Sequence, residues 1–367
     1  MVLLEATDVV HYLLSRGLIT RECVVEGDLV IIDVSSRRNR NFKIRQKHAP
    51  GLFVKQPRTW TPDALGALRR EARCYQLAQS NADFAALAPL VPTLLHYDDR
   101  SQVLVVELIG ESENLREHHQ RLGRFASDVA EQLGTALGKY HAGTTVRPDA
   151  PTESSVFPGL APWILSFHSQ PIRPDSRRGA VLQLSKILRQ YPEFMRQVDE
   201  LRNTWRFDCL IHGDMKWDNC LVYPRDSQDG RVNLKIVDWE LADFGDSCWD
   251  IGAILQAYLS SWVLSIPDTG MTPATILVDQ AQYKLDDMQP AISAFWQAYA
   301  MTRQIGAEAA RDLLERSMRY GAARMIQTVF ELSTETSQLS PFAVRLLQLS
   351  DNILANPKEA VEHLLAA

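Results

Sequence analysis

The amino-acid sequence predicts an α+β fold, in which a small antiparallel β-sheet with one main helix precedes a larger, mostly helical part. Segments with β-branched content or two-residue alternation gather before residue 108. From Arg121 onward, apolar residues recur every three or four positions, which indicates helices. We therefore expect two lobes, residues 1–108 and residues 109–367.

The first lobe is expected to begin with a short amphipathic helix and to continue into strands. In the second strand Phe42 and Ile44 alternate with Lys43 and Arg45, as in a strand with one buried face. A helix opens at Thr61, because proline is tolerated at the first helical turn. The expected helices are 6–18 and 61–79, and the expected strands are 29–34, 41–46, 52–56 and a hairpin within 94–107.

The second lobe reads as a series of helices. Residues 134–139 superficially resemble a phosphate-binding loop, but only three residues separate the glycines and Tyr140 stands where Ser or Thr is needed. We interpret them as helix. The proline-rich segment 143–178 is irregular, and a substrate-facing insertion is one hypothesis for it. The expected helices are 121–143, 180–190, 193–205, 251–264, 275–303, 305–335 and 341–365.

Composition excludes several classes of protein. The 367 residues suffice for one large domain or two lobes, and a net charge of −6 gives no reason to expect nucleic-acid binding. No stretch approaches the roughly 18 uncharged apolar residues of a membrane span. The five cysteines show no metal-ligand spacing, so we expect free thiols. The acidic N-terminus does not resemble a signal peptide, and a cytoplasmic location is expected.

Two polar clusters follow apolar, strand-like runs. His212 and Asp214 come after the first run, Asn219 lies five residues beyond Asp214, and Asp238 follows the second run. A magnesium-nucleotide phosphotransferase needs one carboxylate facing the attacking hydroxyl, and an amide oxygen with a second carboxylate on the metal. The alternative is that His212-Gly-Asp214 is an ordinary turn whose aspartate caps its own backbone.

Lys55 and Glu71 form a second candidate pair. Lys55 lies in a strand between apolar neighbours, and Glu71 falls on the next helix, 16 residues later. A lysine inside a strand is costly to bury unless a carboxylate pairs with it. The alternative is that both are solvated surface charges.

With these pieces placed, the chain resembles the aminoglycoside phosphotransferase and choline kinase family, which shares the protein-kinase fold. The matching features lie within residues 30–265. They are Lys55, Glu71, Leu133–Ala142, His212-Gly-Asp214-x4-Asn219, Ile236-Val-Asp238-Trp-Glu240 and Gly245-Asp-Ser-Cys-Trp-Asp250-Ile.

The resemblance implies a role for each matching position. Asp214 would be the catalytic base or the carboxylate that orients the hydroxyl, and His212 would brace the catalytic loop. Asn219 and Asp238 would hold Mg²⁺, with ATP or GTP as phosphoryl donor. Lys55, oriented by Glu71, would contact the α- and β-phosphates. The backbone from Glu107 to Ile109 would meet the adenine edge, and Asp250 would secure the catalytic loop.

Asp250 also has a purely local interpretation. It precedes an apolar run, so it reads as a helix N-cap or an acidic residue in the first helical turn.

Two features depart from the pattern of the family that the chain resembles. The first hairpin has no Gly-x-Gly-x-x-Gly, and Ser35, Ser36 and Arg37 stand in its place. Hydroxyls, amides and arginines all bind phosphate oxygens, so these residues are candidate phosphate ligands, with a solvated loop as the alternative. Lys216 stands two residues after Asp214, where Ser/Thr protein kinases also carry a lysine. This likeness implies that Lys216 would stabilise charge on the transferred phosphoryl group, with a solvent-facing loop lysine as the alternative.

The expected acceptor is a small hydroxylated molecule such as an aminoglycoside, amino alcohol or sugar. Only 11 residues separate Asp238 from Asp250, too few for a peptide-docking activation segment. Nearby acids (Glu240, Asp243 and Asp246) would suit a cationic acceptor. One alternative is phosphorylation of Ser or Thr in a biosynthetic precursor peptide before elimination, which would require a partner protein. Another is a nucleotide-binding scaffold without turnover.

Overall fold

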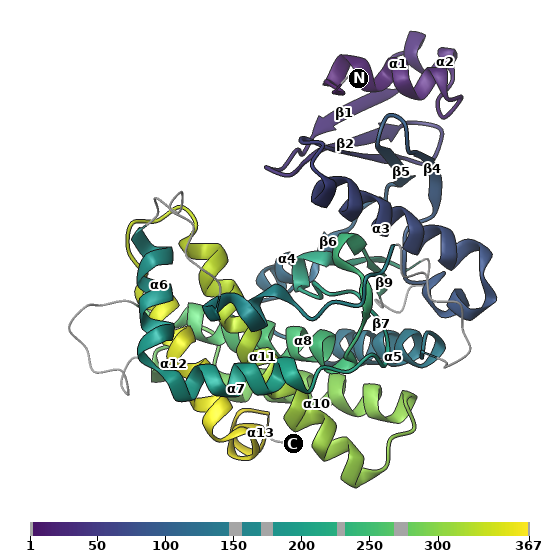
Figure 1. The fold of residues 1–367 in the computed structure, drawn as a ribbon. Helices are drawn as coiled ribbons and strands as arrows, with labels where there is room; N and C mark the ends of the chain where they lie inside the picture. Colours follow the sequence, from purple (N-terminus) through teal and green to yellow (C-terminus); the bar gives the residue numbers. More distant parts are fainter. Residues whose placement is uncertain (1–2, 147–155, 170–178, 226–231, 268–277, 366–367) are drawn as a thin grey trace. The chain divides into compact units, whose positions relative to one another are not determined.

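The computed structural model describes residues 3–146, 156–169, 179–225, 232–267 and 278–365 (Figure 1). It divides into two compact units. Unit 1 comprises residues 1–115, 151–158 and 219–242, and unit 2 comprises the rest of the chain. Each unit therefore joins segments that are distant in sequence. The lobe boundary at residue 108 stays a prediction.

A five-stranded antiparallel sheet organises unit 1, as expected for the first lobe. Its strand order is β1-β2-β3-β5-β4, so three consecutive strands, β1 to β3, are joined to the β4–β5 hairpin by the pairing of β3 with β5. The strands lie at β1 (Leu29–Asp33), β2 (Asn39–Gln46), β3 (Leu52–Pro57), β4 (Leu94–Asp98) and β5 (Val103–Glu107).

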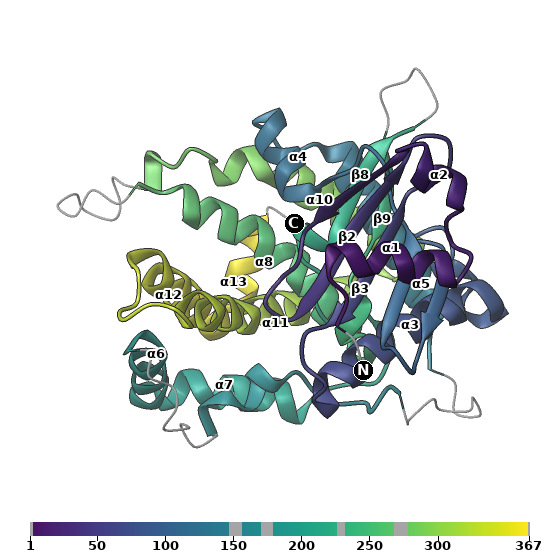
Figure 2. The same cartoon turned by 90° about the horizontal axis from the view of Figure 1, so that it is seen from above.

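One face of this sheet is apolar. Phe42 pairs with Val54, and Val54 pairs with Val105, so all three side chains point to the same side. Helix α1 (Ala6–Ser15) contributes Val9 and Leu13 to the same buried cluster. Figure 2 shows α1 crossing over the strands. The apolar alternation in β2 thus has the physical cause that its period predicted.

The opposite face of the sheet carries Lys55. Helix α3 (Pro62–Ser80) contributes Glu71 to this face. Thr61 is its N-cap and proline stands in its first turn, as predicted. Leu68, Ala72 and Tyr75 are buried on the inner side of α3, and Glu71 is buried among them. A charged residue on the buried side of a helix needs a partner, and Lys55 supplies it.

A smaller three-stranded sheet completes unit 1. Its strands are β6 (Glu113–Asn114), β8 (Cys220–Pro224) and β9 (Val232–Ile236), with β8 in the centre. Asn219 directly precedes β8 and Asp238 follows β9 by two residues. The Val237 amide donates to the Asn219 carbonyl at 2.9 Å, so the ladder holds these two backbone segments side by side.

Unit 2 is mostly helical, as expected for the second lobe. Strands β7 (Cys209–Ile211) and β10 (Asp243–Gly245) pair antiparallel beside the helices. The helices are α4 (Leu115–Leu122), α5 (Ser127–Gly143), α6 (Gly179–Gln190), α7 (Pro192–Asn203), α8 (Ser247–Ser265), α10 (Leu285–Thr302), α11 (Ala307–Ser333), α12 (Pro341–Ala355) and α13 (Pro357–Leu365).

Glycines allow two close helix crossings in unit 2. A Cβ on Gly134 of α5 would lie 2.1 Å from the Phe295 carbonyl oxygen of α10. A Cβ on Gly252 of α8 would lie 2.5 Å from the Ser317 carbonyl oxygen of α11. The glycine-containing stretch 134–139 is therefore helix, as predicted, and Gly134 serves packing.

Other expectations from the sequence can be compared with the structure. None of the five cysteines forms a disulfide. The helices in the described ranges include none both long and apolar enough to cross a membrane. Within the proline-rich segment, residues 147–155 and 170–178 lie outside the described residues, and Trp163–Ser169 forms a 3₁₀ helix, η2.

The Gly252 crossing predicts a stability change. Gly252→Ala places a methyl group against backbone, which cannot give way as a flexible side chain can. We expect a loss of about 1–3 kcal/mol in the free energy of unfolding, measured by urea denaturation. Gly66→Ala is the control, because a Cβ at this α3 position meets nothing within 4 Å. It should gain about 0.5–1 kcal/mol, and equal losses in both variants would contradict the crossing.

Candidate functional site

The lysine of β3 lies within a cluster of three carboxylates in unit 1. Lys55 Nζ is 2.6 Å from Glu71 Oε2, 2.5 Å from Asp238 Oδ1 and 3.1 Å from Glu240 Oε2. Lys55 is only 4% exposed. The structure thus brings together Lys55, Glu71 and Asp238, which the sequence singled out, and adds Glu240.

The charges in this cluster do not balance, since three carboxylates face one ammonium group. Burial disfavours the ammonium ion, but Glu71, Asp238 and Glu240 outweigh it and hold the pKa of Lys55 well above its ordinary value. Burial, with the nearby carboxylates and against the attraction of Lys55, raises the pKa of Glu71 to about 7. The cluster therefore has capacity for a further positive charge.

The same carboxylates form a candidate cation site. Glu71, Asp238 and Glu240 each place one oxygen so that all three lie within 4.8 Å of one another. Asp238 has a left-handed backbone (φ 67°) and a side chain 37% exposed, so its carboxylate is accessible. Carboxylate and amide oxygens are the ligands that Mg²⁺ and Ca²⁺ prefer. The three carboxylates fit a hard divalent cation by their chemistry, and the role of Asn219 as an amide ligand stays a prediction.

In the hairpin between β1 and β2, the serine hydroxyls accept hydrogen bonds from backbone amides of the same hairpin. The Ser36 hydroxyl accepts hydrogen bonds from the amides of Arg38 and Asn39 at 3.3 and 3.0 Å. The Ser35 hydroxyl accepts from the Asn41 amide at 3.1 Å. Roles of Ser35, Ser36 and Arg37 in phosphate binding stay predictions.

Glu107 and Ile109, at the end of β5 and just after it, interact with residues of unit 1. Glu107 accepts a hydrogen bond from the Thr93 hydroxyl at 2.6 Å and lies 3.7 Å from Lys235. The Ile109 carbonyl accepts from the Ser112 hydroxyl at 2.8 Å. Contacts of this stretch with a nucleotide base stay a prediction.

In unit 2, a buried carboxylate holds the loop that follows β7. Asp250 is fully buried and accepts hydrogen bonds from the amides of His212 and Gly213 at 2.7 and 3.0 Å. The Tyr140 hydroxyl donates to it at 2.5 Å, and His141 Nε2 lies 3.5 Å away. Although burial raises the pKa of Asp250, the nearby His141 ring and the hydrogen bond from Tyr140 contribute to a net decrease.

Asp250 lies in the first turn of α8, and it binds residues outside this helix as well as interacting with the helix dipole. The N-cap is Asp246, which accepts from the Cys248 amide at 3.1 Å. Of the two local interpretations, the first-turn acid is therefore confirmed and the N-cap is wrong. The cap must precede the first helical residue, Ser247, and Asp250 lies inside the helix.

His212 also supports the loop from within. Its Nδ1 accepts a hydrogen bond from the Asp214 amide at 3.2 Å. His212 is fully buried, so it braces the backbone that carries Asp214.

Asp214 is held between two cations. Its Oδ1 accepts from Arg324 Nη2 at 3.1 Å, and its Oδ2 lies 2.8 Å from Lys216 Nζ. Burial alone would raise the pKa of Asp214, but Arg324 and then Lys216 outweigh it and hold the pKa well below its ordinary value. Asp214 is therefore ionised at neutral pH.

Arg324 is a site residue that was not predicted from the sequence. It lies in the middle of α11, is 4% exposed, donates to the Gly213 carbonyl at 3.2 Å and stacks 5.0 Å over the Trp249 ring. A signal was present, because a lone arginine between Ala322-Ala323 and Met325-Ile326 predicts a buried charge with a specific partner.

Aromatic rings support the loop on another side. Trp217 contacts His119 and Tyr258 edge-on, with ring centroids 4.8 and 4.9 Å apart. Arg116 of α4 pairs with Asp218 at 2.8 Å. Trp217 and Asp218, the two residues that follow Lys216, are thus fixed to helices of unit 2.

The acids expected to suit a cationic acceptor have structural partners. Asp243 accepts hydrogen bonds from the Gly159 and Leu160 amides at 2.8 and 3.0 Å. Asp246 pairs with Arg316, and Glu240 pairs with Lys55. These contacts leave no acid of this set as specific support for a cationic acceptor.

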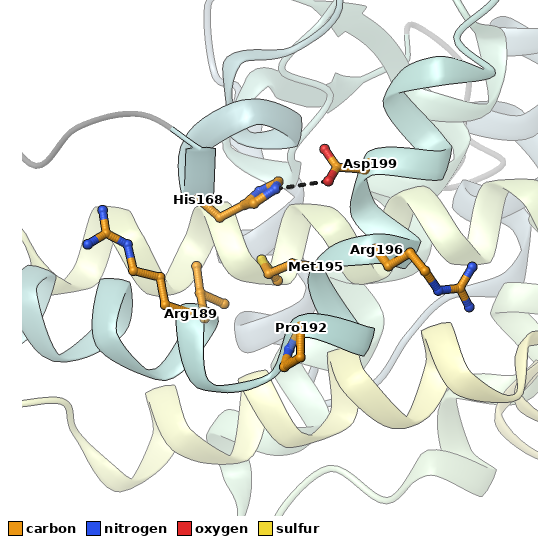
Figure 3. Close-up of a pocket in the computed structure, with 7 residues that line it drawn as sticks. His168, Arg189, Pro192, Met195, Arg196 and Asp199 are labelled. Atoms are coloured by element: carbon orange, nitrogen blue, oxygen red, sulfur yellow. Dashed lines mark hydrogen bonds and ion pairs between the residues drawn. The ribbon is translucent and has the colours of Figure 1, made fainter.

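A separate cavity of about 300 Å³ lies between η2 and helices α6 and α7 (Figure 3). Leu188, Pro192 and Met195 line it, and His168 and Asp199 interact at 3.3 Å on one side. Arg189 and Arg196 also line it, and their guanidinium groups point away from it (Figure 3). None of the predicted site residues lines this cavity.

The family model described as "Phosphotransferase enzyme family" matches residues 31–291. A choline/ethanolamine kinase family protein from Mesorhizobium loti has 16% sequence identity and a TM-score of 0.52, with 99% of each chain covered. The amicoumacin kinase hAmiN has 14% identity and a TM-score of 0.52, covering 93% of this chain and 94% of its own.

These structural likenesses confirm the predicted kinase-like fold class. At such low identity they speak to the fold alone. Among curated proteins no match was found.

The position of Asp250 predicts the result of Asp250→Asn. An amide has one acceptor oxygen, so the variant leaves at least one buried N–H of the loop unpaired. We expect a loss of about 3 kcal/mol in the free energy of unfolding and faster hydrogen exchange at His212 and Gly213. Tyr140→Phe is the control, because it removes one donor and should cost about 1 kcal/mol. Unchanged exchange at both amides would rule out this anchoring.

Proposed function

This chain belongs to the phosphotransferase enzyme family, and we propose that it transfers the γ-phosphoryl group of ATP or GTP to a hydroxyl group of a small molecule. The observation that carries the proposal is the buried Lys55 ammonium, paired with Glu71 and lying beside Asp238. A strand lysine oriented by a helix glutamate is how kinases hold nucleotide phosphates. A purely structural ion pair would not need a third, accessible carboxylate.

Asn219 and Asp238 would hold Mg²⁺, and Glu240 lies close enough to assist. When bound, the cation neutralises charge on the phosphate oxygens. Lys55 and Lys216 supply positive charge from the protein for the same purpose. The excess of carboxylates around Lys55 supports this assignment, because the cluster carries negative charge that a cation would offset.

Asp214 would orient the acceptor hydroxyl. Its depressed pKa, caused by Arg324 and Lys216, makes it a weak base but keeps it ionised as a hydrogen-bond acceptor. Orientation of the attacking oxygen is therefore its main contribution, with proton uptake following bond formation. Arg324 and the brace from His212 hold the carboxylate in one place.

A small-molecule acceptor fits the relatives of similar fold, whose names refer to choline, ethanolamine and amicoumacin. The acceptor of this chain is proposed to be a small alcohol, without a preference for a cation. We propose a cytoplasmic location, where the five thiols would stay reduced. No contact with nucleic acid or membrane is proposed.

Asp214→Asn tests the function directly. The variant should lower kcat for phosphoryl transfer by about 10²-fold or more, because an amide orients the hydroxyl poorly and accepts no proton. Transfer from labelled ATP or GTP is measured across a panel of alcohols, aminoglycosides, sugars and a Ser/Thr peptide. Wild-type turnover in the variant would remove Asp214 from its role. Nucleotide binding without any product from the wild type would favour a scaffold, and a phosphorylated peptide alone would favour a precursor-peptide kinase.

Asp238→Asn tests the metal site. Calorimetric titration with ATP should show that Mg²⁺ strengthens binding to the wild type and that this gain falls by about 10-fold in the variant. The control is Asp99→Asn, which changes an exposed carboxylate on the hairpin between β4 and β5. An unchanged Mg²⁺ dependence in Asp238→Asn would take this residue out of the metal shell.

A further inference from the structure

We propose that Arg38 and Asn39 bind the phosphates of the nucleotide, and that Glu240 holds these two side chains beside Lys55 until the nucleotide arrives. The inference rests on the proposed function, since it assigns further residues to the same nucleotide site. It concerns unit 1 alone, where the hairpin, Lys55 and Glu240 all lie.

The strand register places Asn39 on the face of the sheet that carries Lys55. Asn41 is directly opposite Lys55, and Asn39 is opposite Pro57. Residues opposite one another in an antiparallel pair share a face, and so do residues two apart along a strand. Asn39, Asn41 and Lys55 therefore project to the same side.

Three donors converge on the Glu240 carboxylate. Arg38 Nη1 lies 3.4 Å from Oε1, while Asn39 Nδ2 and Lys55 Nζ lie 3.3 and 3.1 Å from Oε2. Glu240 is itself fixed, because its carbonyl accepts from Arg70 Nε of α3 at 3.1 Å. A guanidinium, an amide and an ammonium aimed at one anionic group are the donors that a phosphate group requires.

The contact between Arg38 and Glu240 is weak enough to exchange. The Arg38 side chain is 77% exposed, and exposed ion pairs contribute little to stability. A phosphate carries more charge than a carboxylate and accepts bidentate hydrogen bonds from arginine. Arriving phosphates would therefore displace Glu240 from Arg38 at small cost.

The hairpin turn is built so that it presents these side chains without glycine. The Ser36 hydroxyl binds the amides of both Arg38 and Asn39, and Arg58 Nε donates to the Ser36 carbonyl at 2.6 Å. The serines thus fix the turn, while the side chains that follow them supply the donors. In a glycine-rich loop the backbone amides would do this instead.

An unsatisfied group on the same face also points to a ligand. Asn41 Oδ1 is buried and has no hydrogen-bond partner among the described residues. A buried polar atom without a partner costs free energy unless something absent from the folded chain satisfies it. Asn41 stands opposite Lys55, so the missing partner belongs at the nucleotide site, where it must be a hydrogen-bond donor or a cation that arrives with the phosphates.

The first experiment measures ATP affinity by calorimetry in the presence of Mg²⁺. Arg38→Ala and Asn39→Ala should each weaken binding by about 10-fold, because each removes a hydrogen bond to a charged group. Arg45→Ala is the matched control, since it removes the same charge from an exposed position further along β2. Arg45→Ala should change the affinity by less than about 2-fold.

The second experiment isolates Glu240 from any metal. Without divalent cations, Glu240→Gln should tighten ATP binding by about 3-fold or more, because the competing charge is gone while the side-chain shape is kept. Weaker or unchanged metal-free binding in Glu240→Gln would overturn the holding role.

Failure of the inference differs from failure of the proposed function. Wild-type affinity in both Arg38→Ala and Asn39→Ala would overturn the phosphate contacts alone. Equal losses in those variants and in Arg45→Ala would also overturn them, since the effect would then be general charge. Absence of nucleotide binding in the wild type would instead overturn the proposed function. Thermal unfolding midpoints close to that of the wild type would show that the variants are folded.

Discussion

The buried carboxylate of Asp250 is the constraint on which the arrangement of unit 2 depends. It accepts hydrogen bonds from two successive backbone amides of the loop after β7 and from Tyr140 of α5, while itself belonging to α8. An ionised group can be buried only when its acceptors are satisfied. The loop, α5 and α8 must therefore keep one arrangement. This arrangement fixes the position of Asp214, which lies in the loop.

Unit 1 has a comparable centre in Lys55, with the opposite sign. Here one ammonium group holds carboxylates from α3 and from the segment after β9. Burial, together with the neighbouring carboxylates, raises the pKa of Glu71. The Glu240 carboxylate also accepts hydrogen bonds from Arg38 and Asn39 of the hairpin. A single charge imbalance thus underlies the proposed metal site, the contacts of the hairpin with Glu240 and the proposed exchange of Glu240 for phosphate.

Local patterns predicted many of the elements, because periodicity and capping act over a few residues. The expected single helix 341–365 is wrong, since it is two helices, Pro341–Ala355 and Pro357–Leu365, and the expected helix 121–143 begins only at Ser127. The alternation in β2, the proline at the start of α3 and the helical reading of residues 134–139 all have their causes nearby in the chain. The local pattern was not sufficient for Asp250. Its place before an apolar run allowed two positions in the helix, and only the fold showed that Asp246 caps it and that Asp250 anchors a loop.

The sequence by itself determined the two-part α+β organisation and the spacing of His212, Asp214, Asn219 and Asp238, since a motif is read along the chain. It also made Lys55 a residue that needed a carboxylate. Only the tertiary structure decided that Arg324 reaches Asp214 across 110 positions and that Glu240 collects donors from the first hairpin. Such partners depend on helix crossings like that at Gly252 and on strand register, which are set by packing over the whole unit and leave no fixed spacing in the chain.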